Sequence, residues 1–203
     1  MNRLNIGSQY FSRVSPTKSA RIILKMFQPL DFHFYLVNLD PSYPPPAEVE
    51  GVKFYGDALE RVIQKRNSTY PTEFFRDKIA DARLCFLAEV HDEMASIVWV
   101  YTADNHRQLI DLRPKELELN ASSTVTKFAG RGLYRANMQF ALHGLAQKGI
   151  QRVWASAASD NPIPMLQMPK IGFVKVATIH RCSLFGPRFK AHEFMDSNPT
   201  TPG

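Results

Sequence analysis

Two glycines one residue apart, Gly130 and Gly132, lie in the sequence TKFAGRGLYRANM at residues 126–138. The preceding residues 115–126, KELELNASSTVT, alternate as in a β-strand, and residues 133–148 carry apolar side chains at helical spacing. A strand, a glycine turn and a helix in this order direct several free backbone N–H groups at one point, where the helix dipole adds positive charge. The sequence therefore predicts a binding site for a phosphate or diphosphate at this turn.

Two common phosphate-binding patterns do not fit the turn. The dinucleotide-binding pattern GxGxxG needs a third glycine where this chain has Arg135, and GxxxxGK followed by Ser or Thr does not occur in the sequence. Lys127, Arg131 and Arg135 add positive charge around the glycines. Because Gly-x-Gly also occurs in ordinary strand-to-helix turns, the neighbouring elements must decide between the two interpretations.

Strict alternation over residues 115–126 predicts two distinct faces of one strand. One face would carry Leu117, Leu119, Ala121, Ser123 and Val125, and the other would carry Glu116, Glu118, Asn120, Ser122 and Thr124.

The rest of the chain reads as further short strands and helices. Strands are predicted at 31–40 and 150–158, a hairpin at 83–102 with its turn at residues 91–93, and one or two closing strands at 171–186. Helices are predicted at 56–68 and 71–82, and the proline-interrupted stretch 159–170 predicts a helix that is short or distorted. The order favours an α/β fold with a mixed, mostly antiparallel sheet and helices on both faces.

The 203 residues suit one domain, expected at 18–190, between a polar arm at 1–17 and a mobile tail at 191–203. The formal charge of +6 favours an anionic ligand. Cys85 and Cys182 lie in apolar runs and the histidines lack ligand spacing, so neither a disulfide framework nor a metal site is expected. No signal peptide or membrane-spanning run is recognisable, and a cytoplasmic location is the default expectation.

Four features between residues 80 and 186 follow one another in the order of a known family. They are the strand at 116–126, AGRGLYRA opening a helix, QKGIQRVWASAASDN as helix end, strand and Asn, and KIGFVKV as a closing element. With the hairpin at 83–102, this region resembles the GNAT superfamily of acyl-CoA-dependent N-acyltransferases.

The resemblance implies a GNAT-like fold in which the two central parallel strands separate from each other. It also implies acetyl-CoA or another acyl-CoA as co-substrate. The diphosphate would lie on the glycine turn, the pantetheine arm along the strand end before it, and Asn161 would hydrogen-bond that arm. The cofactor-binding residues implied in this way are Ser122, Ser123, Thr124, Val125, Thr126, Gly130, Arg131, Gly132, Leu133, Tyr134, Arg135 and Asn161.

The sequence departs from the family pattern at three positions. The glycine motif usually opens with Gln or Arg and closes with Gly or Ala, and this chain has Ala129 and Tyr134 there. The Tyr that commonly protonates the leaving thiolate, seven residues after the Asn, is replaced by Met168. Methionine cannot donate a proton, so Tyr134 is considered as a substitute.

An N-acyl transfer also needs a base, because a primary amine is protonated at neutral pH. Glu118 is the first candidate, since it falls where the histone-acetyltransferase branch keeps a glutamate, and Glu116 and Glu89 are alternatives. Trp99, Tyr101 and Trp154 would either line an acceptor pocket or fill the core.

These features predict an N-acyltransferase that moves an acetyl or other acyl group from coenzyme A to a small-molecule primary amine. A catalytically silent GNAT-like module that binds acyl-CoA or a protein partner is the alternative. A homodimer is possible, whereas a nucleic-acid partner is disfavoured because the cations do not cluster with aromatic residues.

Overall fold

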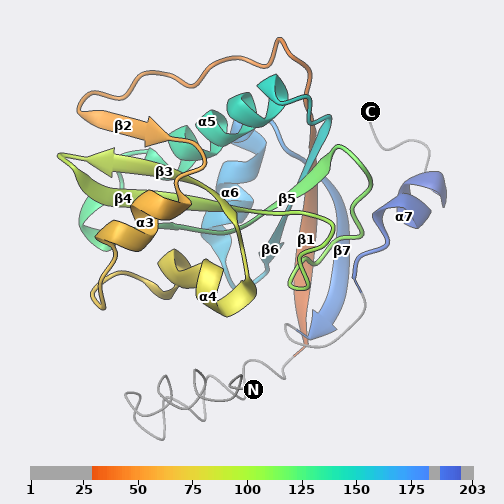
Figure 1. The fold of residues 1–203 in the computed structure, drawn as a ribbon. Helices are drawn as coiled ribbons and strands as arrows, with labels where there is room; N and C mark the ends of the chain where they lie inside the picture. The colour runs from red at the N-terminus through yellow and green to blue at the C-terminus, as the bar shows by residue number, and fades with distance from the viewer. Residues whose placement is uncertain (1–28, 183–187, 198–203) are drawn as a thin grey trace, which may run out of the picture.

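The computed structural model describes residues 29–182 and 188–197, which form a seven-stranded sheet with helices on both faces (Figure 1). The arm expected at 1–17 and the last residues of the expected tail, 198–203, lie outside the described residues. The strands are β1 (Pro29–Asn38), β2 (Val52–Tyr55), β3 (Leu84–Val90), β4 (Glu93–Tyr101), β5 (Glu116–Thr124), β6 (Arg152–Ala158) and β7 (Val174–Cys182). Their order across the sheet is β2-β3-β4-β5-β6-β1-β7, and the β5–β6 pair is parallel while the others are antiparallel.

Seven helical segments accompany the sheet in the described part of the chain. They are α3 (Leu59–Lys65), η1 (Thr72–Phe75), α4 (Arg76–Ala80), η2 (Thr126–Phe128), α5 (Leu133–Gln147), α6 (Pro162–Ile171) and α7 (Ala191–Ser197), where η marks a single 3-10 turn. Helices α5 and α6 cover one face of the sheet and share an apolar core with β4, β5 and β6. The other face is covered by α3, η1 and α4 near β3 and β4, and by α7 near β1 and β6. The predicted mixed sheet with helices on both faces is confirmed.

The hairpin between β3 and β4 turns at His91 and Asp92, as the sequence indicates. Both residues have positive φ, 51° and 62°, which a two-residue turn of the type favoured between twisted strands requires. Strand β2 was not predicted. It pairs four residues with β3 at the edge of the sheet, and so short a strand shows no recognisable alternation.

Helix α5 buries the predicted stripe at Leu133, Ala136, Ala141 and Leu145, while Phe140 is half-buried. Asn137 is also fully buried, and a buried polar side chain needs a hydrogen-bond partner to offset the loss of water. Its Nδ2 donates to Phe86 O at 3.3 Å and Ser96 O at 3.0 Å, so this one side chain ties α5 to both β3 and β4.

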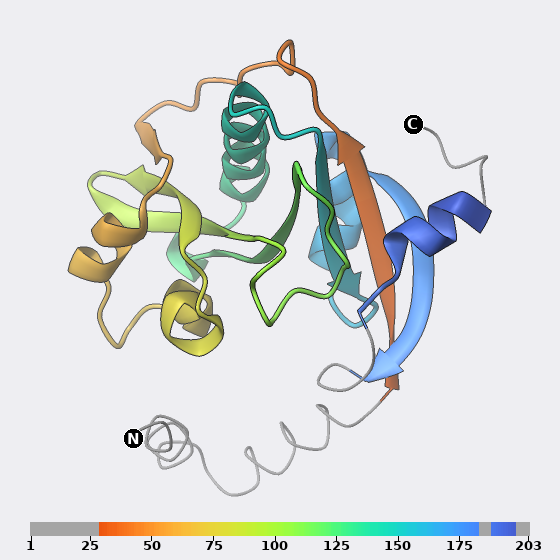
Figure 2. The same ribbon diagram turned by 45° about the vertical axis from the view of Figure 1, so that its right-hand side comes forward.

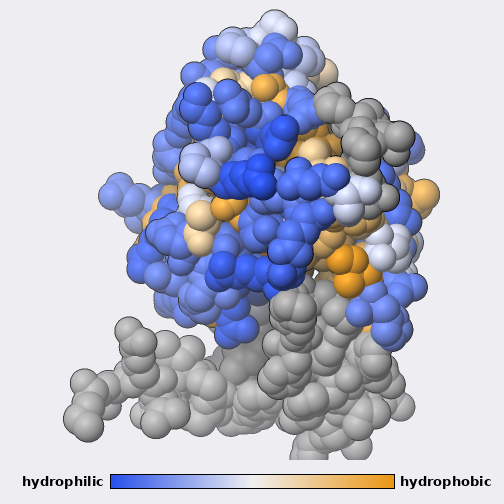
Figure 3. Space-filling model, turned by 90° about the vertical axis from the view of Figure 1, so that its right-hand side faces the viewer, coloured by the Kyte–Doolittle hydropathy of each residue, from blue (hydrophilic) through white to orange (hydrophobic). Residues whose placement is uncertain are grey.

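The segment 191–197, predicted to fray, instead forms helix α7 beside β1 and β7 (Figure 2). Three contacts explain this difference. Phe189 forms a parallel bridge with Ile110, Ala191 N donates to Asp111 Oδ1 at 2.6 Å, and the buried His192 lies with Nε2 3.2 Å from Glu116 Oε2. Polar residues cover most of the surface on this side of the molecule, with small hydrophobic patches between them (Figure 3).

Candidate active site

Strand β5 carries one extra residue opposite β4. The pairs on either side of the irregularity are Ile97–Ser123 and Trp99–Asn120. Two residues of β5, Ala121 and Ser122, therefore stand opposite Val98 alone, which is a β-bulge. Ala121 has a φ of 49°, a left-handed conformation that is uncommon for a residue other than glycine.

The bulge reverses the alternation of side chains along β5, so the strict two-face pattern predicted for residues 115–126 is wrong beyond Asn120. Ser122 Oγ lies 3.6 Å from the sulfur of Met138 in α5. Glu118, in contrast, accepts hydrogen bonds from the amides of Leu109 and Ile110 on the opposite face.

The two parallel strands also part from each other. The β5–β6 pairing runs from Glu116–Arg152 to Leu119–Ala155, yet β5 continues to Thr124 and β6 to Ala158. The last residues of the two strands are therefore unpaired with each other. This is the separation between central strands that the sequence resemblance implies.

The glycine turn lies directly after β5 and η2. Gly130 and Gly132 have φ values of 78° and 74°, which only glycine adopts without strain, and a Cβ at either position would meet no atom within 4 Å. The glycines are thus required by the backbone conformation, and the space beside them is open.

The turn leaves a run of backbone donors free. Within the described residues, no backbone or side-chain acceptor takes the N–H groups of residues 130–135. Regular helical bonding begins with Ala136 N, which donates to Gly132 O at 3.0 Å. Gly130, Arg131, Gly132 and Arg135 are exposed, so their amides meet solvent or a ligand.

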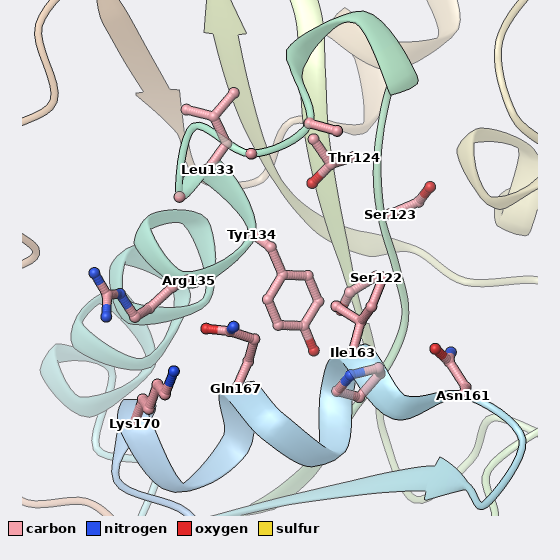
Figure 4. Close-up of a pocket in the computed structure, with 14 residues that line it drawn as sticks. Ser122, Ser123, Thr124, Leu133, Tyr134, Arg135, Asn161, Ile163, Gln167 and Lys170 are labelled. Atoms are coloured by element: carbon pink, nitrogen blue, oxygen red, sulfur yellow. The ribbon is translucent and has the colours of Figure 1, made fainter.

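A pocket of about 540 Å³, the splay pocket, joins the end of β5, the glycine turn and α6 (Figure 4). Its lining residues are Ser122, Ser123, Thr124, Ala129, Gly130, Gly132, Leu133, Tyr134, Arg135, Asn161, Ile163, Pro164, Gln167 and Lys170. Arg135 and Lys170 supply its positive charge, and neither forms an ion pair with a described carboxylate.

No protein-family profile matches the chain, and no curated protein matches it. Solved structures do match. A GCN5-related N-acetyltransferase from Sphaerobacter thermophilus superposes with a TM-score of 0.52 and 18% identity, over 83% of this chain and 55% of that one. A putative GNAT-family acetyltransferase from Novosphingobium aromaticivorans gives 0.50 and 11%, over 74% of this chain and 62% of that one. The glucosamine N-acetyltransferase region of a fungal GH3 β-N-acetylglucosaminidase gives 0.52 and 13%, over 83% of this chain and 23% of that one.

The chain has the GNAT fold. The predicted GNAT-like fold is confirmed, with the parallel pair and its separation in place. This chain spans little more than half of the length of the first two structures. At these identities the similarity concerns the fold, so activity, substrate and partners are matters for proposal.

Most of the cofactor-binding residues predicted from the GNAT resemblance lie together along the splay pocket, and three do not. Val125 donates its amide to Ala95 O at 2.8 Å, and Thr126 O accepts from Ala129 N at 3.0 Å. Arg131 lines a neighbouring depression of about 410 Å³ with Val49, Glu50, Gly51, Val52, Val90, His91 and Leu133.

Helix α6 supplies the opposite wall of the splay pocket. Pro162 and Pro164 fall in its first turn, where the missing N–H has no helical acceptor, so these prolines do not shorten it. The helix runs for ten residues and ends at Gly172, with φ 108°. Asn161 stands at its N-cap without a side-chain capping bond and lines the pocket. Sequence reasoning missed Gln167 and Lys170, which become visible only once α6 is known to form a full helix.

Met168, at the position of the usual proton donor, does not reach the pocket. Its side chain is 3% exposed and packs into the core between α6 and the sheet. Tyr134 lies in the pocket instead, with its ring between α5, Ser122 and α6 (Figure 4). Burial raises the pKa of Tyr134 well above its ordinary value, and the neighbouring Tyr35 acts in the same direction.

The structure does not place Glu118, the predicted base, at the splay pocket. Its side chain is fully buried on the other face of the sheet, and both carboxylate oxygens accept hydrogen bonds. The donors are Leu109 N at 2.7 Å and Ile110 N at 3.3 Å to Oε2, and Asn120 Nδ2 at 2.8 Å to Oε1. Glu118 therefore anchors the segment that follows β4.

The two alternative bases, Glu116 and Glu89, also form hydrogen bonds or ion pairs away from the splay pocket. Glu116 is buried and accepts from Arg152 Nη1 at 3.2 Å, Trp154 Nε1 at 3.3 Å and Arg113 N at 3.1 Å. Glu89 forms ion pairs with Arg61 and Lys65 at 2.7 and 2.8 Å, at the far edge of the sheet.

The three aromatic candidates for an acceptor pocket, Trp99, Tyr101 and Trp154, are buried in the core. Cys85 is a buried free thiol. Within residues 29–182 and 188–197, no group of three His, Cys, Asp or Glu residues could hold a metal ion. In the same part of the chain, no helix has the length and hydrophobicity needed to cross a bilayer.

Proposed function

We propose that the protein is an acyl-CoA-dependent N-acyltransferase. The observation that carries this proposal is the row of free amides at residues 130–135 opening on a pocket beside two separating strands. Such a row at a helix N-terminus binds phosphate oxygens, and the open space beside Gly130 and Gly132 admits them. Arg135 and Lys170 add charge attraction for the diphosphate of coenzyme A.

The pantetheine arm of the acyl donor would lie along the end of β5. Beyond Leu119 this strand has no β6 partner, so its backbone groups on that side are available to the amides of pantetheine. Ser122, Ser123 and Thr124 line this part of the pocket, with Asn161 across from them. The thioester would then stand between the separating strands.

In the transfer step, the neutral amine attacks the thioester carbonyl. A C–N bond forms, the C–S bond breaks, the amine proton passes to water, and the thiolate takes a proton from the Tyr134 phenol. Because burial keeps the Tyr134 pKa high, this phenol is protonated throughout the neutral range and is available as an acid. The phenolate then regains its proton from water.

The pocket-lining residues include no Asp, Glu or His. Glu118 lies on the opposite face, where it is fully buried and its carboxylate already accepts hydrogen bonds from Leu109 N, Ile110 N and Asn120 Nδ2. We therefore assign proton removal from the amine to water and a positioning role to Glu118. This arrangement is compatible with amide formation, since a thioester has a good leaving group and the amine needs only to be neutral at the moment of attack.

A direct test has two parts. Calorimetric titration with acetyl-CoA is expected to give saturable binding in about the micromolar range, and absence of binding at millimolar ligand would remove the basis of the proposal. Thiol release from acetyl-CoA is then followed over a panel of amines. Binding without release for every amine would support the second candidate, a silent acyl-CoA-binding module, which the burial of Met168 favours.

A further inference from the structure

Arg76, the first residue of α4, holds a guanidinium group without a partner. Its Nε has no solvent contact and no hydrogen bond, and within the described residues the side chain forms no ion pair. The adjacent carboxylate, Asp77, is held by both terminal nitrogens of Arg66. A buried Nε without an acceptor costs free energy, and because the side chain as a whole is partly exposed, an anionic ligand can approach it.

The place of Arg76 in the fold connects it to the splay pocket. It directly follows η1, which packs against β5, and Phe75 of η1 shares an apolar cluster with Ala121 at the bulge. This cluster lies on the face covered by α3 and α4, whereas the splay pocket opens on the face covered by α5 and α6. Arg76 therefore stands across the separating strands from the proposed donor site.

The charges around Arg76 are unbalanced. Burial raises the pKa of Tyr101 on β4, and Arg76 and Arg107 both act to lower it, which places the two guanidinium groups near that phenol. The carboxylate close to Tyr101 is Glu118, whose oxygens already accept from Leu109, Ile110 and Asn120. Two guanidinium groups and one carboxylate therefore lie near Tyr101.

In this inference the amine approaches the thioester through the separating strands, from the face that the donor does not occupy. We propose that the acceptor is an amine that also carries a carboxylate, of the amino-acid class, and that Arg76 binds this carboxylate. The proposal rests on the acyltransferase function given above. A planar guanidinium pairs with a carboxylate through two parallel hydrogen bonds, and one part-buried guanidinium matches its single negative charge.

The test compares amino acids with their own carboxamides, which differ only in the negative charge, as acceptors for acetyl-CoA in a thiol-release assay. Arg76→Gln should raise KM for the carboxylate member about tenfold to a hundredfold and leave the carboxamide member unchanged. For each acceptor, KM in the variant is divided by KM in the native protein, so intrinsic differences in amine basicity between the two acceptors cancel. Arg76→Lys should restore part of the loss.

Arg83→Gln is the matched control, because Arg83 is an exposed arginine close to α4 that pairs with Asp81 on the surface. This substitution should change KM for neither acceptor. Acetyl-CoA affinity reports whether each variant is folded, since Arg76 does not line the donor pocket.

The inference would be overturned if the native protein used an amino acid and its carboxamide equally well, or if it preferred phosphorylated amines. An equal effect of Arg76→Gln on the amino acid and on its carboxamide would also overturn it. Acetyl-CoA binding without turnover of any carboxylate-bearing amine would also overturn it. Absence of acetyl-CoA binding would instead overturn the proposed function itself.

Discussion

Glu118 and Ser122, four residues apart on β5, project from opposite faces of the sheet. In a regular strand, residues with this spacing share a face. The bulge at Ala121 removes Ser122 from the face of the buried carboxylate and brings it to the pocket beside α5. One extra residue thus divides β5 into a first part with buried structural carboxylates and a last part that lines the splay pocket.

The bulge predicts opposite responses to two substitutions at one position. Ala121→Gly should stabilise the fold by about 1 kcal/mol, because glycine adopts positive φ without strain, and Ala121→Val should destabilise it by about 2 kcal/mol. Urea unfolding measures both. Ala155→Gly, at a regularly paired position of β6, is the control and should be destabilising by about 1 kcal/mol. Destabilisation by Ala121→Gly would contradict the left-handed conformation.

The glycine turn allows a matched pair of variants. Gly132 and Gly149 lie at the two ends of α5, with φ values of 74° and 78° and no atom near a Cβ at either site. Each change to Ala should cost about 1 kcal/mol of stability. Gly132→Ala alone should weaken acetyl-CoA binding, by about tenfold, because the strained turn no longer presents its amides. Equal affinities of the two variants would argue against diphosphate binding at the turn.

Tyr134 is expected to act in the chemical step. Tyr134→Phe should lower kcat about tenfold to a hundredfold with little change in acetyl-CoA affinity. Since burial raises the Tyr134 pKa, the phenol stays protonated beyond the ordinary value of about 10, and no loss of rate from its ionisation is expected below that pH. Tyr43→Phe is the control, because that hydroxyl donates to Ile171 O at 3.0 Å outside the pocket. An unchanged kcat in Tyr134→Phe would remove Tyr134 as the acid.

The position of Glu118 predicts a pH profile. Without a pocket base, kcat/KM should rise with pH until the acceptor amine has lost its proton. Glu118→Gln should lower stability, since Leu109 N, Ile110 N and Asn120 lose a charged acceptor, and should leave the shape of this profile unchanged. A plateau at neutral pH that disappears in Glu118→Gln would restore Glu118 as the base.

Glu89 predicts an acid-sensitive part of the stability. Burial alone would raise the pKa of Glu89, but hydrogen bonds and ion pairs from Arg61 and Lys65 outweigh it and hold the pKa below its ordinary value. The stabilisation is therefore present above the unfolded pKa of about 4.3 and is lost as pH falls through the folded value. Glu89→Gln should be less stable than the native chain at pH of about 7 and should show a weaker decline toward acid pH in thermal unfolding.

Local patterns predicted the parts of the site that local sequence determines. Gly130 and Gly132 marked the turn, and the spacing of Leu133, Ala136 and Ala141 marked α5, because glycine conformation and helical periodicity are short-range properties. The bulge was not predictable in this way, since alanine gives no sign of a positive φ.

The role of Glu118 depended on contacts distant in the sequence. Its burial results from the segment around Ile110, which Phe189 holds from the C-terminal end of the chain. Helix α7 was missed for the same reason, because its stability comes from docking on β1 and β5 rather than from its own sequence.

The buried position of Met168 has a consequence for introducing a tyrosine at this position. A tyrosine at 168 would enlarge a side chain that already fills the space between α6 and the sheet, so its hydroxyl would be enclosed by hydrocarbon and its bulk would push the helix outward. A hydroxyl therefore cannot be brought from α6 into the splay pocket by exchanging residue 168 alone, because the helix would first have to turn about its own axis.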